Sequence, residues 1–281
     1  MPPTFLLVAA LLAQADPESR SWNQPVEPFR VVGNVYSVGA NEITSFLVTT
    51  DRGHILLDGG FVETAPQILA NIRKLGFRPE DVKVILNSQA HYDHAGGLAQ
   101  LKQATGAKVE IMEGDAEQVA RGGRGDFAFG DKFLFPPLSP DRVLHAGDTV
   151  TVGGVSMKAV LTPGHTRGCT TWAITAVERG RSYSVVFVCS TTAPGYELAH
   201  NPAYPSIVED FRATFRTLEA LPCDVFLASH GSFFHLREKT ERLRRGDPLA
   251  FVDPRGYRSF VAESRRAFEA QLQAQLAAAA H

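Results

Sequence analysis

Six consecutive residues, Gln89-Ala90-His91-Tyr92-Asp93-His94, carry four side chains that can bind a metal ion. The segment follows the apolar stretch 82–86 and precedes Ala95-Gly96-Gly97, a pattern that predicts a strand, a loop and then a helix. Imidazoles and a carboxylate at a strand end suit Zn²⁺, which binds nitrogen and oxygen donors at about 2.0–2.2 Å. The sequence therefore predicts a fold that holds a metal site at the end of a strand.

Two other histidines lie in similar positions. His165 belongs to Thr162-Pro163-Gly164-His165-Thr166, directly after the apolar stretch 155–161, and His230 follows another apolar stretch in Ala228-Ser229-His230-Gly231. Either histidine alone is more simply explained as structural, but together with the six-residue cluster they indicate one metal centre. The remaining histidines have no such context and are interpreted as surface or ordinary hydrogen-bonding residues: His54, His145, His200, His235 and His281.

The order of apolar segments predicts two blocks of strands, each followed by helices. The expected strands are 29–37, 44–49, 54–57, 82–87, 108–112, 149–152, 155–161, 170–176, 183–188 and 224–228, and the expected helices are 64–75, 98–105, 207–218 and 260–279. This order favours an α/β sandwich of two sheets with helices outside, and loops of both halves would meet at one edge to form the metal site. Residues 122–141 contain Gly, Pro and three phenylalanines, which fits either a packed surface loop or an apolar flap beside an active site.

Composition and length leave room for one large domain or two small ones. The 281 residues are 44% hydrophobic, and no low-complexity linker divides residues 16–281, so we expect a single domain there. With 28 basic and 30 acidic side chains and no basic cluster to match a phosphate backbone, nucleic-acid binding is not expected.

The first 15 residues have features of an export signal. The apolar run 5–12 is too short to span a bilayer, and Ala13-Gln14-Ala15 is an A-x-A cleavage pattern, although residues 1–4 lack a positive charge. We therefore expect a signal peptide over residues 1–15, a periplasmic mature chain from about Asp16, and no membrane attachment after cleavage. The alternative is a disordered apolar tail.

Three cysteines, Cys169, Cys189 and Cys223, form an odd set without a C-x-x-C motif. Cys169 and Cys189 flank a predicted hairpin that turns at 178–181, so they can be neighbours across its strands. A disulfide between them stays open as an alternative, but two packed free thiols are the preferred interpretation.

At the metal cluster the chain resembles the metallo-β-lactamase superfamily, whose motif is H-x-H-x-D-H with later G-H and S/P-H-G elements. The similarity runs from about residue 29 to 260 and is most like class B, subclass 3. Four further segments match that subclass: Leu57-Asp58-Gly59-Gly60, Thr162-Pro163-Gly164-His165-Thr166, Ala193-Pro194-Gly195-Tyr196 and Leu221-Pro222-Cys223-Asp224-Val225. The resemblance implies the αββα sandwich of this family.

Carried over position by position, the resemblance implies two zinc sites. The first would use Gln89, His91 and His165, and the second Asp93, His94 and His230. The family motif has histidine where this chain has Gln89, and a neutral amide oxygen is a weaker zinc donor than imidazole. A minority branch of the subclass has the same Gln and works with one zinc in the second site, so one or two zinc ions per chain are expected.

The resemblance also implies roles around the metal. Asp93 would ligate zinc and orient or deprotonate water, and Tyr196 would help to polarise the lactam carbonyl. Ser190 and Thr192 would contact the substrate carboxylate, and Phe129 would belong to an apolar flap. Ser190 stands where related thioester hydrolases have a bridging aspartate, and a register slip would exchange it for Cys189. Asp58 would steady the metal loop, and the alternative is an ordinary turn aspartate.

The expected function is therefore zinc-dependent hydrolysis of the β-lactam ring of penicillins, cephalosporins or carbapenems by a monomer. Its expected partner is this small-molecule substrate. Two alternatives stay open. One is a hydrolase of the same fold that acts on lactones, thioesters or phosphoesters. The other is a non-catalytic zinc-binding protein in which Gln89 marks a decayed site.

Overall fold

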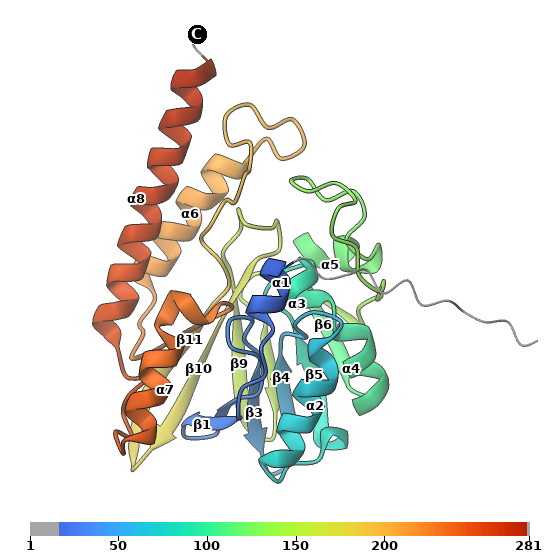
Figure 1. Cartoon of the computed structure of the whole chain (residues 1–281), viewed down its shortest axis with the longest axis vertical. Coiled ribbons are helices and arrows are strands. Elements are labelled where there is room, and N and C mark those ends of the chain that lie inside the picture. The colour runs from blue at the N-terminus through green and yellow to red at the C-terminus, as the bar shows by residue number, and fades with distance from the viewer. Residues whose placement is uncertain (1–16, 280–281) are drawn as a thin grey trace, which may run out of the picture.

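Two β-sheets lie face to face at the centre of the molecule, and helices cover both outer sides (Figure 1). The structure, a computed structural model, describes residues 17–279, so the expected signal peptide over 1–15 and His281 lie outside the described residues. Within residues 17–279, no helix combines the length and the apolar character needed to cross a membrane.

The first sheet has seven strands in chain order. They are β1 (Phe29–Val32), β2 (Val35–Ser37), β3 (Phe46–Thr50), β4 (Gly53–Leu57), β5 (Val82–Leu86), β6 (Lys108–Met112) and β7 (Arg142–Leu144). Strands β1 to β4 pair antiparallel, whereas β4 to β7 pair parallel. Leu57 at the end of β4 pairs with Leu86 at the end of β5. The loops after these two strands therefore begin side by side.

The second sheet has five strands in the order β12-β11-β10-β9-β8. They are β8 (Thr149–Val152), β9 (Val155–Leu161), β10 (Thr170–Glu178), β11 (Arg181–Val188) and β12 (Val225–Ala228). All neighbours are antiparallel except β11 and β12, where Val188 pairs in parallel with Ala228. The residues that follow β11 and β12 consequently leave the sheet together.

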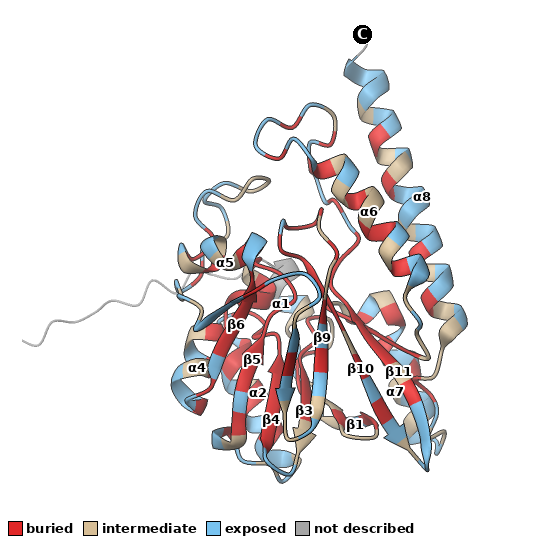
Figure 2. Cartoon of the chain, turned by 180° about the vertical axis from the view of Figure 1, so that it is seen from behind, coloured by how far each residue is buried: buried red, intermediate tan, exposed pale blue. Residues whose placement is uncertain are grey.

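The helices divide between the two outer faces. Helices α2 (Thr64–Lys74), α4 (Leu98–Thr105) and α5 (Glu113–Ala120) lie beside the first sheet, and α6 (Ile207–Ala220), α7 (Leu236–Arg244) and α8 (Pro254–Ala279) lie on the opposite side (Figure 1). Shorter elements are α1 (Pro17–Trp22), α3 (Tyr92–Ala95), η1 (Pro79–Asp81) and η2 (Gly231–Phe234). In Figure 2 the central strands are largely buried, while the exposed residues of the long helices face outward.

Successive side chains of the central strands point to opposite faces of the first sheet and form two apolar cores. Phe46, Leu57 and Leu86 point between the sheets and pack in the cluster that contains Trp172 and Phe187. Their strand neighbours Leu47, Leu56 and Ile85 join the second cluster, with residues of α2 and α4. Because successive side chains of a strand point to opposite faces, strands that are apolar throughout can serve both cores.

Most of the predicted elements agree with the structure, and three differences have a local cause. The expected strand 29–37 is a hairpin of β1 and β2, because Gly33 adopts a φ of 51° and turns the chain back. Strand β7 was not predicted, since its three residues include only two apolar ones. Helix α8 begins at Pro254, six residues before the expected start, and proline is well tolerated in the first turn of a helix.

Candidate metal centre

The candidate site forms where four strands end at one edge of the sandwich. Asp58 follows β4, and residues 87–94 follow β5 and lead into α3. The loop 162–169 joins β9 to β10, and His230 comes two residues after β12. Because the β4–β5 and β11–β12 pairs are parallel, their carboxyl ends deliver these loops to the same place.

Asp93, His94 and His230 form one group of converging donors. The Nε2 atoms of His94 and His230 are 3.3 Å apart, and Oδ2 of Asp93 lies 3.2 Å from the first and 3.5 Å from the second. The three donor atoms all lie within 4.8 Å of one another. The group therefore has the composition and the compactness of a metal site.

Gln89, His91 and His165 form a second group. Nδ1 of His91 lies 2.8 Å from Oε1 of Gln89 and 3.1 Å from Nε2 of His165. The amide oxygen of Gln89 thus points into the group, while its buried amide nitrogen has no hydrogen-bond partner among the described residues. The structure brings together all six residues that the sequence singled out as metal ligands.

The outward ring nitrogens of the Asp93 group face carboxylates. Nδ1 of His94 lies 3.3 Å from Oδ2 of Asp58, and Nδ1 of His230 lies 3.5 Å from Oε1 of Glu42. Asp58 is itself fixed by the backbone N–H and the hydroxyl of Ser88, at 2.6 and 2.7 Å. An acceptor at the outer nitrogen favours the tautomer whose inner nitrogen is free to bind a metal.

The other two imidazoles are oriented in the same way. Nδ1 of His165 donates to the backbone carbonyl of Thr192 at 2.7 Å. Nε2 of His91 is buried 3.5 Å from Oδ2 of Asp126. All four imidazoles therefore direct one nitrogen inward and place the other against an oxygen, an arrangement that fits a bound metal.

The electrostatics of the site are organised around a positive charge. Burial alone would raise the pKa of Asp93, but the charge of His94 and the hydrogen bond with His230 outweigh it and hold this pKa well below its usual range. Burial opposes the charged form of His94, yet Asp93 and Asp58 raise its pKa to about 10. Burial and the proximity of His91 keep the pKa of His165 well below its usual value. A positive charge beside Asp93, here on His94, is thus favoured.

A cavity of about 860 Å³ opens above the donors. His91, Asp93, His165 and His230 line it from below. Its walls carry aromatic side chains: Trp22, Tyr92, Phe129, Phe133 and Phe233. Lys132 is the one lysine among the described residues that line the cavity, and its ammonium group lies over the ring of Phe133. The cavity suits a small molecule that combines apolar and anionic groups.

The comparisons with known proteins agree with this geometry. A family model described as the metallo-β-lactamase superfamily matches residues 38–230. The chain belongs to this superfamily. The structure is similar to the FEZ-1 metallo-β-lactamase of Legionella gormanii, with 40% identity, a TM-score of 0.89, and 90% of this chain and 98% of that chain covered. It is also similar to BJP-1, a subclass B3 metallo-β-lactamase of Bradyrhizobium japonicum, with 35% identity and a TM-score of 0.86. This match covers 92% of this chain and 97% of that chain.

Sequence relatives within the superfamily have other names. A hydroxyacylglutathione hydrolase of Rhodospirillum rubrum is 33% identical over 104 residues, which are 37% of this chain and 32% of that protein. The chain spans about a third of the length of the first curated relatives it matches. The metallo-β-lactamase fold and a resemblance to subclass B3 are therefore established, as the sequence predicted, whereas the relatives differ in substrate.

One contributor to this superfamily site was missed in the sequence. Asp115 is 3% exposed and accepts hydrogen bonds from the backbone N–H of Ala90 at 2.9 Å, the hydroxyl of Thr166 at 2.7 Å and the backbone N–H of Gly168 at 2.7 Å. It thereby ties the loop of Gln89 and His91 to the loop of His165. Asp115 lies in an ordinary helical segment, so nothing in the local sequence distinguishes it.

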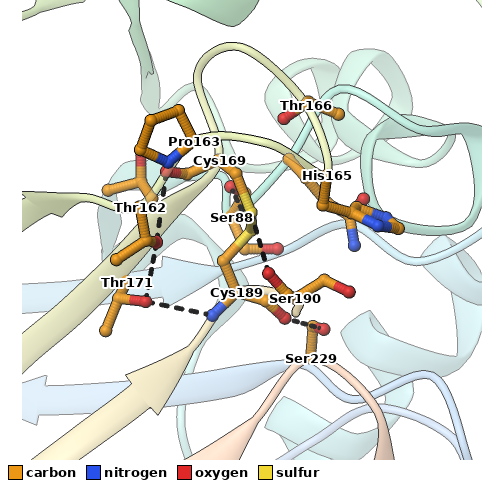
Figure 3. The surroundings of a disulfide bond; sticks show 12 residues. Ser88, Thr162, Pro163, His165, Thr166, Cys169, Thr171, Cys189, Ser190 and Ser229 are labelled. Carbon is orange, nitrogen blue, oxygen red and sulfur yellow. Dashed lines mark hydrogen bonds between the residues drawn. A yellow bond between two sulfur atoms is a disulfide. The ribbon is translucent and has the colours of Figure 1, made fainter. Parts of the chain in front are cut away.

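The preferred interpretation of two free thiols beside the site is wrong, because Cys169 and Cys189 form a disulfide (Figure 3). The β10–β11 register pairs Trp172 with Phe187, which leaves the two cysteines at the open end of the hairpin with Cα atoms 5.9 Å apart. This spacing is within the range that a disulfide spans. Sγ of Cys189 also lies 3.1 Å from the carbonyl oxygen of Ser88. Cys189 is therefore committed to the disulfide and is not a metal ligand, and Cys223 is free.

The substrate-contact residues expected from subclass 3 lie in different environments. Phe129 and Thr192 line the cavity, whereas Ser190 is 2% exposed, with its hydroxyl 3.2 Å from that of Thr192. Tyr196 is 1% exposed, and its hydroxyl donates to the carbonyl of His165 at 2.9 Å. In this structure the hydroxyl supports the backbone of His165 and Tyr196 is not among the residues that line the cavity, while its expected role in polarising a carbonyl stays a prediction.

Proposed function

We propose that this protein hydrolyses the β-lactam ring of penicillins, cephalosporins or carbapenems with the help of zinc. The observation that carries the proposal is the convergence of six donors below one aromatic-walled cavity. Asp93, His94 and His230 would hold one zinc ion, and Gln89, His91 and His165 would hold a second one less tightly. When bound, zinc supplies Lewis-acid activation of water and of the substrate carbonyl.

The residues of the chain would position the reactants. Asp93, an anion held at the cavity floor, is placed to accept a proton from the attacking water. Thr192 and Lys132 line the cavity and offer a hydroxyl and a positive charge to the substrate carboxylate. The rings of Phe129 and Phe133 provide an apolar wall for its side chain and exclude water from one side of the site.

The residue at position 190 favours β-lactam over thioester hydrolysis. Ser190 has no carboxylate to bridge two metal ions, whereas the resemblance implies an aspartate here in thioester hydrolases. The subclass B3 structures, which match 88–92% of this chain, support the same choice. Thioester hydrolysis is the second candidate, because two hydroxyacylglutathione hydrolases are each 33% identical to this chain, over 104 and 87 residues.

Cell location and assembly are part of the same proposal. We infer that the chain is exported to the periplasm, since residues 1–15 have the pattern of a signal peptide, and we propose that it acts there as a monomer. The Cys169–Cys189 disulfide is in keeping with an oxidising compartment.

The first experiment is turnover of nitrocefin and of a carbapenem together with zinc content, measured on one purified sample. A thioester such as S-D-lactoylglutathione and an acyl homoserine lactone serve as competing substrates. We expect β-lactam turnover that disappears on chelation and returns with zinc. Faster turnover of the thioester would move the assignment to the second candidate. Tight zinc binding without turnover of any substrate would favour a non-catalytic zinc-binding protein.

A further inference from the structure

Asp126 in the 122–141 loop uses its two carboxylate oxygens in different ways. Oδ1 accepts hydrogen bonds from the backbone N–H groups of Ala128 and Phe129, both at 2.8 Å. The backbones of Asp126 and Gly130 also pair with each other, at 3.1 and 2.9 Å. This oxygen therefore fixes the turn that carries the cavity-lining Phe129.

The other oxygen of Asp126 faces the metal centre. Oδ2 lies 3.5 Å from Nε2 of His91, and both side chains are buried, with 9% and 7% exposed. Nδ1 of the same imidazole points the other way, toward Gln89 and His165. The carboxylate thus lies directly behind one of the six donors.

We propose that Asp126 is a positioning residue that couples the cavity wall to metal binding by the Gln89 group. The carboxylate lies 3.5 Å from Nε2 without a hydrogen bond to it, and its negative charge favours the proton on that nitrogen, which leaves the lone pair of Nδ1 free for the metal. The inference rests on the metal centre of the proposed function but not on its β-lactam substrate.

The Gln89 group has particular need of such support. The Asp93 group contains an anionic ligand, whereas Gln89, His91 and His165 are all neutral donors, and the amide oxygen is the weakest of them. A negative charge behind His91 makes that imidazole a stronger donor. The charge of Asp126 therefore compensates in part for the weak donor strength of the Gln89 amide oxygen.

Asp126 also determines where the ring of Phe129, which forms part of the cavity wall, lies. The ring of Phe129 is 5.4 Å from the ring of His91, in an edge-to-face contact. Because Asp126 holds the backbone of Phe129 and faces His91, ordering of the turn and metal binding should favour each other. Such coupling is reciprocal, so metal binding should protect the turn as much as the turn supports the metal.

The test compares three variants of the full chain. In Asp126→Asn the amide oxygen can still accept from Ala128 and Phe129, but the amide N–H₂ would face Nε2 of His91 and drive the proton to Nδ1. Asp126→Ala removes both contacts. The matched control is Asp131→Asn in the same loop, where Oδ1 accepts from the backbone N–H of Gly125 at 2.8 Å and the ion pair is with Arg124.

The readouts are the two zinc affinities, from competition with a chelating indicator, and hydrogen exchange of the amides 126–133. We expect Asp126→Asn to weaken the lower-affinity zinc about 10-fold or more and to leave the tighter one unchanged. Zinc should slow exchange of the Ala128 and Phe129 amides in the unsubstituted protein but not in this variant. Asp131→Asn should leave both affinities unchanged.

Three results would overturn the proposal. One is an Asp126→Asn variant that binds the lower-affinity zinc as tightly as the unsubstituted protein does. Another is an equal loss of affinity for this zinc in Asp131→Asn, which would assign the effect to the loop as a whole. The third applies even if the variants fail to fold: nitrogen NMR of the zinc-loaded, unsubstituted protein should place the proton of His91 on Nε2. A proton on Nδ1 instead would contradict the mechanism. None of these readouts depends on β-lactam turnover, so they are independent of the substrate assignment.

Discussion

The two donor groups at the sheet edge differ in charge although they share one loop. The Asp93 group contains a carboxylate and is backed by two more, Asp58 and Glu42. The Gln89 group consists of neutral donors and is backed by a single carboxylate and a backbone carbonyl. The fold thus places six donors with similar spacing, and we expect the charge around them to set how strongly each group would bind a metal.

The largest expected effect is the difference in β-lactam turnover between a substitution in the Asp93 group and one in the Gln89 group. Asp93→Asn removes the anionic ligand and the proton acceptor, so we expect turnover of nitrocefin to fall by about 10³-fold, equivalent to about 4 kcal/mol of transition-state stabilisation. Gln89→Ala should cost much less, on the order of 10-fold. Steady-state kinetics at saturating zinc provide the comparison. Equal losses in the two variants would mean that both groups are needed for turnover.

The disulfide gives the next largest effect and acts mainly on the Gln89 side. Replacing both Cys169 and Cys189 by Ser should lower the free energy of unfolding by about 3 kcal/mol, because the cross-link constrains the unfolded chain. Since Cys169 belongs to the loop of His165, loss of the disulfide should weaken the Gln89 group more than the Asp93 group. Urea denaturation and zinc competition measure the two effects. Cys223→Ser is the control, and an equally large loss there would contradict the assignment.

A smaller effect probes the support of the Asp93 group. Glu42 accepts from the backbone N–H and the hydroxyl of Ser232, at 3.0 and 2.6 Å, and faces His230. Glu42→Gln removes the negative charge behind this imidazole and should weaken the tighter zinc about 10-fold. Glu27→Gln, at an exposed ion pair with Lys74, is the matched control. Zinc competition that detects no difference between the variants would argue against this support.

The smallest expected change repairs the weaker group. Gln89→His replaces the amide oxygen by an imidazole and should raise the zinc content from about one toward about two per chain. Metal analysis after dialysis against a fixed zinc concentration measures it. An unchanged zinc content would show that Gln89 is not the residue that limits metal binding by this group.

The six converging donors could be predicted from the sequence because each lies in a short pattern at a strand end. The hydrophobic periodicity likewise placed β5, β9 and α4. The residues behind the ligands could not be found in this way. Glu42 lies 188 positions before His230, and Asp115 lies on a helix, so only the folded chain reveals their contacts.

The wrong interpretation of the two cysteines has an equally local cause. The hairpin was predicted, but whether Cys169 and Cys189 form a disulfide depends on the backbone path just outside the paired residues of its two strands. The position of Tyr196 near the site came from a motif, and a motif does not specify which way a buried hydroxyl points, here toward the carbonyl of His165.

The parallel pairing of β12 with β11 has a consequence for how the protein matures. His230 is the last of the six donors and follows β12, which joins its sheet only after α6 has crossed over. Pairings between distant segments form slowly and late. A tight zinc ion would then bind only to chains in which both sheets are complete, and metal uptake would report successful folding instead of guiding it.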